Sequence, residues 1–146
     1  MGKEGGKQME KRGFPLDSVC FKLGKVYRNV QRYYENNLQS FGLTPVQYFV
    51  IMNLYHRDGM KFKELANALS IEGPTLTGLI DRMERAGFLE RRSDPDDRRS
   101  ILVYLTDKGK LIGPEIHNLA NQLDEKLKTQ FSDRDFELFL DILDRI

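Results

Sequence analysis

The chain has 146 residues, of which 23 are basic and 22 acidic, so its formal net charge at pH 7 is +1. This length suits one domain with a substantial core and is short for two. The net charge by itself favours neither the presence nor the absence of nucleic-acid binding. Any attraction to DNA must therefore come from the local placement of cations.

The composition favours a cytoplasmic protein. Cys20 is the sole cysteine and cannot form an intramolecular disulfide. No apolar run approaches the roughly 20 residues that span a bilayer, so no membrane partner is expected. Residues 1–7 lack the apolar core of a signal peptide, and their glycines and charges predict a flexible N-terminus over residues 1–14.

A long first helix is predicted over residues 15–42, because apolar residues recur at helical spacing until Gly42. Thr44 and Pro45 then combine a capping residue with a proline at the first helical position. They predict a second, largely buried helix that ends near Gly59.

Two short helices follow over residues 61–70 and 73–83, and each carries one apolar stripe. Gly73 suits the N-cap of the second helix, and Pro74 suits its first helical position. Two helices joined by so short a turn predict a helix-turn-helix. The stripe of the second helix consists of Leu76, Leu79, Ile80 and Met83.

The hydrophobic period then changes to two, which predicts a hairpin. Residues 88–92 form its first strand, turn-forming residues 93–97 follow, and residues 100–105 return as a β-branched, aliphatic strand. A hairpin after a helix-turn-helix makes a winged helix. Long cations on such a projection suit contact with phosphates or a narrow minor groove. The wing cations are Arg91, Arg92, Arg98 and Arg99.

The C-terminal residues 107–146 are predicted to be helical. Thr106 can cap a helix that runs toward Phe131, and Pro114 within it predicts a kink near residues 110–114 rather than two separate helices. Ser132 caps a last helix.

The apolar stripes of the first and last helices exceed what the winged helix can cover. A second copy of the chain can cover them, which predicts a homodimer; the alternative is a monomer whose terminal helices fold back on one another. The expected fold class is mainly α (α+β). A winged helix-turn-helix core at residues 43–106 lies between an N-terminal dimerisation helix and C-terminal dimerisation helices.

Three sequence runs closely resemble the MarR family of dimeric winged-helix transcriptional regulators. They are residues 79–91 (LIDRMERAGFLER), 94–99 (DPDDRR) and 105–109 (LTDKG). The resemblance implies a homodimer that binds double-stranded DNA at an inverted repeat, with its two recognition helices about one DNA turn, roughly 34 Å, apart.

The resemblance also implies that Thr75, Thr77 and Gly78 face the major groove. Many members carry a longer side chain at the position of Gly78. Arg99 would enter the minor groove, steadied by Asp97.

The residues themselves leave alternatives open. The hydroxyls of Thr75 and Thr77 in a first helical turn suit phosphates, but such residues can also be merely tolerated there. Arg82 suits a phosphate contact or a surface ion pair. Arg98 and Arg99 could belong to an ordinary solvated hairpin tip.

Cys20 resembles the reactive cysteine of the family's hydroperoxide-sensing branch, because Phe21 follows it and Tyr34 lies downstream. That branch places a further tyrosine where this chain has Gly24. The alternative is an inert cysteine in an apolar core.

A small-molecule pocket is a further expectation, because the family's inducer pocket lies beside the winged helix. Arginines there could take a carboxylate and aromatic rings could stack on an aromatic acid. The tyrosines could equally be core or interface residues. The candidate pocket residues are Arg28, Arg32, Tyr33, Tyr48 and Tyr55.

No catalytic or cofactor site is expected. His56 and His117 are too far apart in sequence to suggest a metal site, and the chain has no glycine-rich phosphate loop or nucleophile elbow. The resemblance to the MarR family implies a transcriptional repressor released from a palindromic promoter by a small ligand or an oxidant. The alternative is a winged helix used as a protein-interaction module.

Overall fold

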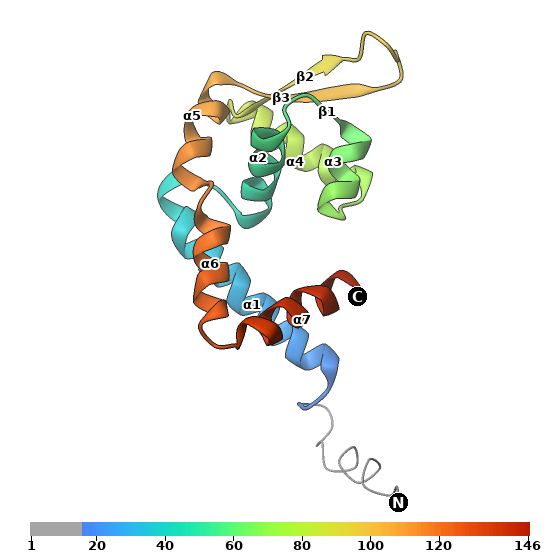
Figure 1. Ribbon diagram of the computed structural model, residues 1–146. Coiled ribbons are helices and arrows are strands. Elements are labelled where there is room, and N and C mark those ends of the chain that lie inside the picture. Colours follow the sequence, from blue (N-terminus) through green and yellow to red (C-terminus); the bar gives the residue numbers. More distant parts are fainter. Residues whose placement is uncertain (1–15) are drawn as a thin grey trace, which may run out of the picture. The chain divides into compact units, whose positions relative to one another are not determined.

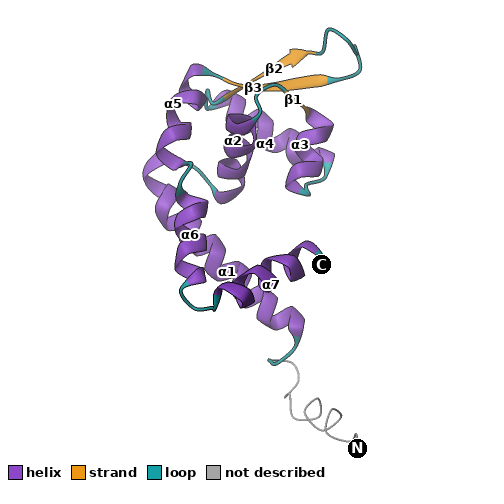
Figure 2. Ribbon diagram, viewed as in Figure 1, coloured by secondary structure: helices purple, strands orange, loops and turns teal. Residues whose placement is uncertain are grey.

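The computed structural model describes residues 16–146 as a mainly helical chain with a small sheet (Figures 1 and 2), which confirms the expected fold class. In chain order the elements are α1 (Val19–Leu38), η1 (Gln39–Phe41), α2 (Pro45–His56), β1 (Met60–Lys61), α3 (Phe62–Leu69), α4 (Gly73–Arg85), β2 (Leu89–Ser93), β3 (Ile101–Leu105), α5 (Asp107–Ile116), α6 (Leu119–Lys128) and α7 (Asp133–Asp144). The flexibility predicted for residues 1–14 lies outside the described residues. Within the described residues, no helix is both long and apolar enough to cross a membrane.

The described chain divides into two compact units, with the boundary between Pro45 and Val46. In the first unit, the Ser18 hydroxyl caps α1 by accepting a hydrogen bond from the Phe21 amide at 3.2 Å. The helix ends through η1 into Gly42, whose φ of 68° is the left-handed conformation that favours glycine. The first helix is therefore slightly shorter than the predicted span.

The second unit holds the winged helix. Its antiparallel sheet has the order β1-β3-β2 within the described residues, and β2 and β3 form the wing. Strand β1 was not predicted, because two residues are too short to show a hydrophobic period. It adds to the sheet by pairing Met60 with Val103.

The core of the winged helix forms where α2, α3 and α4 meet the sheet. The predicted stripe of α4 is buried as expected. Aliphatic side chains of the neighbouring elements are buried as well, each at most 2% exposed. They include Val50, Ile51, Leu54, Leu65, Leu89 and Val103.

The start of α4 differs from the prediction by one residue. Gly73 is already helical, and Glu72 is the N-cap with an extended backbone and no capping bond from its side chain. Pro74 still lies in the first turn, where its missing N–H costs nothing. The helix continues to Arg85.

The prediction of one kinked helix after the wing was wrong. Helix α5 contains Pro114 and ends at Ile116, and the separate helix α6 begins at Leu119. The break follows the proline by about one turn, where His117 Nδ1 lies 2.7 Å from the Pro114 carbonyl oxygen. The His117 side chain thus contacts a carbonyl that an uninterrupted helix would offer to the Asn118 amide.

Candidate nucleic-acid interface

Helix α4 presents an exposed face opposite its buried stripe. Thr75, Thr77 and Arg82 are exposed on the helix and Gly78 is half-buried. The Thr77 hydroxyl donates to the Gly73 carbonyl oxygen at 3.0 Å, so its proton is already used within the helix. Within the described residues, Thr75 and Arg82 have no side-chain partner, which leaves both available to a ligand.

Gly78 leaves an open position on this face. A Cβ atom at Gly78 would meet only Arg82 Nη1, at 4.0 Å. The glycine is therefore not required by packing, and its effect is to make the exposed face flatter at mid-helix.

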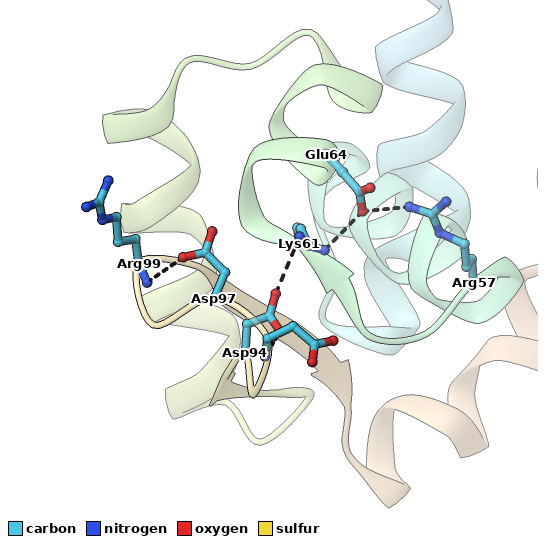
Figure 3. Close-up of polar contacts among 7 residues, drawn as sticks. Arg57, Lys61, Glu64, Asp94, Asp97 and Arg99 are labelled. Atoms are coloured by element: carbon cyan, nitrogen blue, oxygen red, sulfur yellow. Dashed lines mark hydrogen bonds and ion pairs between the residues drawn. The ribbon is translucent and has the colours of Figure 1, made fainter.

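The wing turn is held by aspartate side chains that accept backbone hydrogen bonds. Asp94 Oδ1 accepts from the Asp96 amide at 2.9 Å, and Asp97 Oδ1 accepts from the Arg99 amide at 3.0 Å (Figure 3). Such Asx-type bonds fix a turn locally. The expected partnership of Asp97 with Arg99 therefore involves the Arg99 backbone, and the guanidinium group extends away from the carboxylate.

The wing arginines fall into two groups. Arg91 forms ion pairs with Asp81 at 2.6 Å and Glu84 at 2.7 Å, which tie β2 to α4. The bond to Glu84 raises the pKa of the Arg91 guanidinium. Arg92 pairs with Glu90, and its guanidinium lies 4.1 Å from the centre of the Tyr104 ring.

Arg98 and Arg99 form the second group, at the tip. Both are exposed, and within residues 16–146 neither guanidinium has a partner. The arginines of the strand thus stabilise the wing, whereas the arginines of the turn remain available for a ligand. Sequence reasoning did not separate the two groups, because their partners lie on α4 and β3.

A charged pair that the sequence analysis missed joins the wing to α3. Lys61 Nζ lies 3.5 Å from Asp94 Oδ2, and the Asp94 side chain is only 5% exposed. The Lys61 amide donates to Glu64 Oε2 at 3.2 Å, and Glu64 also pairs with Arg57 at 2.7 Å (Figure 3). The signal in the sequence that could have indicated this pair is Asp94, followed by Pro95, at the start of the turn. From the sequence, these two residues indicated only a turn.

A pocket of about 390 Å³ lies between the start of α3 and the wing. Its lining includes the cations Lys61, Lys63 and Arg99 and the carboxylate of Asp97. This size is within the range of small-ligand sites.

The candidate inducer-pocket residues are distributed over both units. In the second unit, Tyr48 is 1% exposed and its hydroxyl accepts from the Ala120 amide at 3.3 Å. Tyr55 is 45% exposed and its ring lies 6.5 Å from that of His117. Tyr48 is therefore a core residue of its unit, while Tyr55 keeps an open face.

In the first unit, Arg28 and Arg32 are exposed on α1, and Tyr33 is partly buried. Burial raises the pKa of the Tyr33 hydroxyl. Cys20 is exposed in the described chain.

This fold and this site define a winged helix-turn-helix protein, and comparison with known proteins identifies the family. The sequence pattern of the MarR family matches residues 43–101. The HTH-type transcriptional regulator MgrA of Staphylococcus aureus is 30% identical over 108 residues, which are 73% of this chain and 74% of MgrA. The chain belongs to the MarR family, and it is a DNA-binding regulator of transcription rather than an enzyme, as predicted.

Solved structures agree on the fold. A MarR transcriptional regulator from Methanosarcina mazei Go1 has a TM-score of 0.74 at 29% identity, covering 86% of this chain and 91% of its own. The S. aureus MepR–DNA complex has a TM-score of 0.82 at 22% identity, covering 88% of this chain and 95% of MepR.

Proposed function

We propose that the chain is a cytoplasmic homodimeric repressor that binds an inverted-repeat operator and is released by a small ligand or an oxidant. The observation that carries the proposal is the pair of unpartnered arginines at the wing tip, next to a helix-turn-helix with an exposed recognition face. In this arrangement α4 enters the major groove, with Thr75, Thr77 and Gly78 facing the bases and Arg82 near a phosphate. Arg98 and Arg99 reach the backbone and the flanking minor groove.

Exposed apolar surface supports a dimer. The first half of α1 exposes Val19, Val26 and Tyr27 at 52% to 65%, and α7 exposes Leu138 at 51%. A monomer rarely leaves such helical stripes in water, and a second copy covers both. A dimer whose two recognition helices lie about one DNA turn, roughly 34 Å, apart would require a palindromic site.

The trigger for release is proposed to be a small aromatic acid, whose carboxylate an arginine could bind and whose ring could stack on a tyrosine. By linkage, DNA must weaken ligand binding by the same factor by which the ligand weakens DNA binding. An oxidant acting at the exposed Cys20 thiol is the second possibility. Substoichiometric peroxide separates them: loss of DNA binding in the wild type but not in Cys20→Ser supports the oxidant, and unchanged binding in both excludes it.

A salt titration on random-sequence duplex DNA tests the DNA-binding mode. Phosphate contacts make affinity fall steeply with salt, whereas a winged helix that only contacts another protein shows no such binding. We expect Arg99→Ala to weaken binding at least tenfold while the dimer persists. Arg134→Ala, which truncates another exposed arginine at the start of α7, is the control and should bind as the wild type does.

Unchanged affinity of the Arg99 variant would exclude the wing role. A separate experiment, genome-wide footprinting of the purified protein, would identify the operator. Bound promoters without inverted symmetry would contradict the palindromic site.

A further inference from the structure

The pocket between the wing and α3 carries more positive than negative charge. Three cations line it, Lys61, Lys63 and Arg99, against the single carboxylate of Asp97. The Asp97 carboxylate already accepts from the Arg99 amide, and Lys61 is partly compensated by Asp94 at 3.5 Å. Lys63 and the Arg99 guanidinium have no partner within residues 16–146. The pocket therefore offers the Lys63 ammonium group to an anion, while the neighbouring Arg99 guanidinium keeps its proposed role in the minor groove.

The remaining lining suits a ligand with an apolar body. Phe62 and Ile101 line the pocket together with the charged residues. A sugar–phosphate unit has this combination, because its anionic oxygens are joined to a deoxyribose with apolar C–H faces.

We propose that this pocket holds a phosphate group of bound DNA, on the strand that separates the major groove entered by α4 from the minor groove reached by the wing. This rests on the proposed function. A protein that reads two adjacent grooves must cross the sugar–phosphate strand between them. The pocket lies between the helix-turn-helix and the wing, where that crossing occurs.

Lys63 is the residue that tests the proposal. Lys61 also holds Asp94, so removing it would disturb the wing, and Arg99 already has a proposed role in the minor groove. Lys63 is exposed and lies in the first turn of α3, and within the described residues its side chain forms no hydrogen bond or ion pair. Its truncation should leave the fold intact, which circular dichroism verifies.

The experiment compares the wild type with Lys63→Ala, Lys63→Arg and the control Lys126→Ala, which truncates an exposed lysine in the last turn of α6. Affinity for a random-sequence duplex is measured at several salt concentrations. Loss of one phosphate contact should lower the slope of log K against log salt by about 0.9. Lys63→Arg should restore the slope, and the control should keep it.

A second measurement locates the phosphate. On a duplex carrying a footprinted site, single phosphates are replaced by neutral methylphosphonates. One replacement should weaken the wild type severalfold and leave Lys63→Ala unchanged, because the contact is already lost.

The outcomes separate the two proposals. If the affinity of the wild type falls steeply with salt and Lys63→Ala has the same slope, the proposed phosphate pocket is wrong. The proposed DNA-binding role is not contradicted by that result. A methylphosphonate scan in which no position distinguishes the two proteins also overturns it. A wild-type protein that ignores duplex DNA even at low salt overturns both.

Discussion

The ammonium group of Lys61 lies 3.5 Å from the buried carboxylate of Asp94. Lys61 directly precedes α3, and Asp94 is the first residue of the wing turn. The same carboxylate accepts a hydrogen bond from the Asp96 amide at 2.9 Å. One side chain therefore both shapes the turn and fixes it against the helix-turn-helix, so the wing tip has a defined position before DNA arrives.

Replacing Asp94 should destabilise the protein. We expect Asp94→Ala to lower the free energy of unfolding by about 1–2 kcal/mol, because a buried acceptor and an ion pair are lost together. Asp94→Asn, which keeps an acceptor oxygen, should lower the free energy of unfolding by less than Asp94→Ala does. Urea denaturation measures both, and a cycle with Lys61→Ala isolates the coupling. A coupling energy of zero would show that the pair contributes nothing.

The two groups of wing arginines should respond differently to truncation. Arg91→Ala removes the ion pairs with Asp81 and Glu84 and should lower the free energy of unfolding by about 1 kcal/mol, since these half-exposed pairs are partly screened. Arg98→Ala should leave stability within about 0.5 kcal/mol and weaken DNA binding severalfold. Urea denaturation and salt-controlled DNA titration measure the two effects. The reverse pattern would contradict the assignment.

Gly109 should not tolerate a larger side chain. A Cβ atom at this position would lie 2.5 Å from the Phe88 carbonyl oxygen, so Gly109→Ala must shift backbone and should cost about 1–3 kcal/mol. Gly73→Ala meets no atom within 4 Å and is the control. At Gly78, where space is open, alanine should stabilise the helix by about 0.5–1 kcal/mol. Thermal unfolding measures the stability of the three alanine variants. Wild-type stability of Gly109→Ala would contradict the prediction and show that α5 can shift to make room for the added methyl group.

The dimer should depend on the apolar face of α7. Leu138 and Ile142 are 51% and 40% exposed and one turn apart, so aspartate at both should disfavour association without disturbing the core of the chain. Analytical ultracentrifugation should show a folded monomer or a dissociation constant raised at least tenfold. Glu137→Ala, on an adjacent exposed position, should remain dimeric. Unchanged association of the double variant would place the interface elsewhere.

Much of the fold could be predicted from sequence, because the signals were local. The stripe of α4, the proline in its first turn, and the turn residues of the wing each act over a few residues. Thr106 and Ser132 were predicted as caps, and their hydroxyls accept from the Gly109 and Asp135 amides, both at 3.2 Å. The motifs that indicated the family belong to these same local elements.

The remaining features depend on contacts between residues far apart in the chain. Strand β1 exists because β3 pairs with it, and two residues alone have no period to reveal it. Pro114 predicted a disturbance of the helix, but the position of the break at His117 was set by the structure around it. Local pattern indicates where a helix can bend and leaves open whether it bends or ends.

The sequence by itself determined that this chain has a winged helix-turn-helix with cations on the wing. Only the tertiary structure decided which cations are free: Arg91 is held by α4, Lys61 by Asp94, and Arg98 and Arg99 by nothing in the described part of the chain. The physical reason is that a charge's availability depends on its nearest opposite charge. For Arg91 and Lys61, folding brings that opposite charge close from a distant part of the sequence.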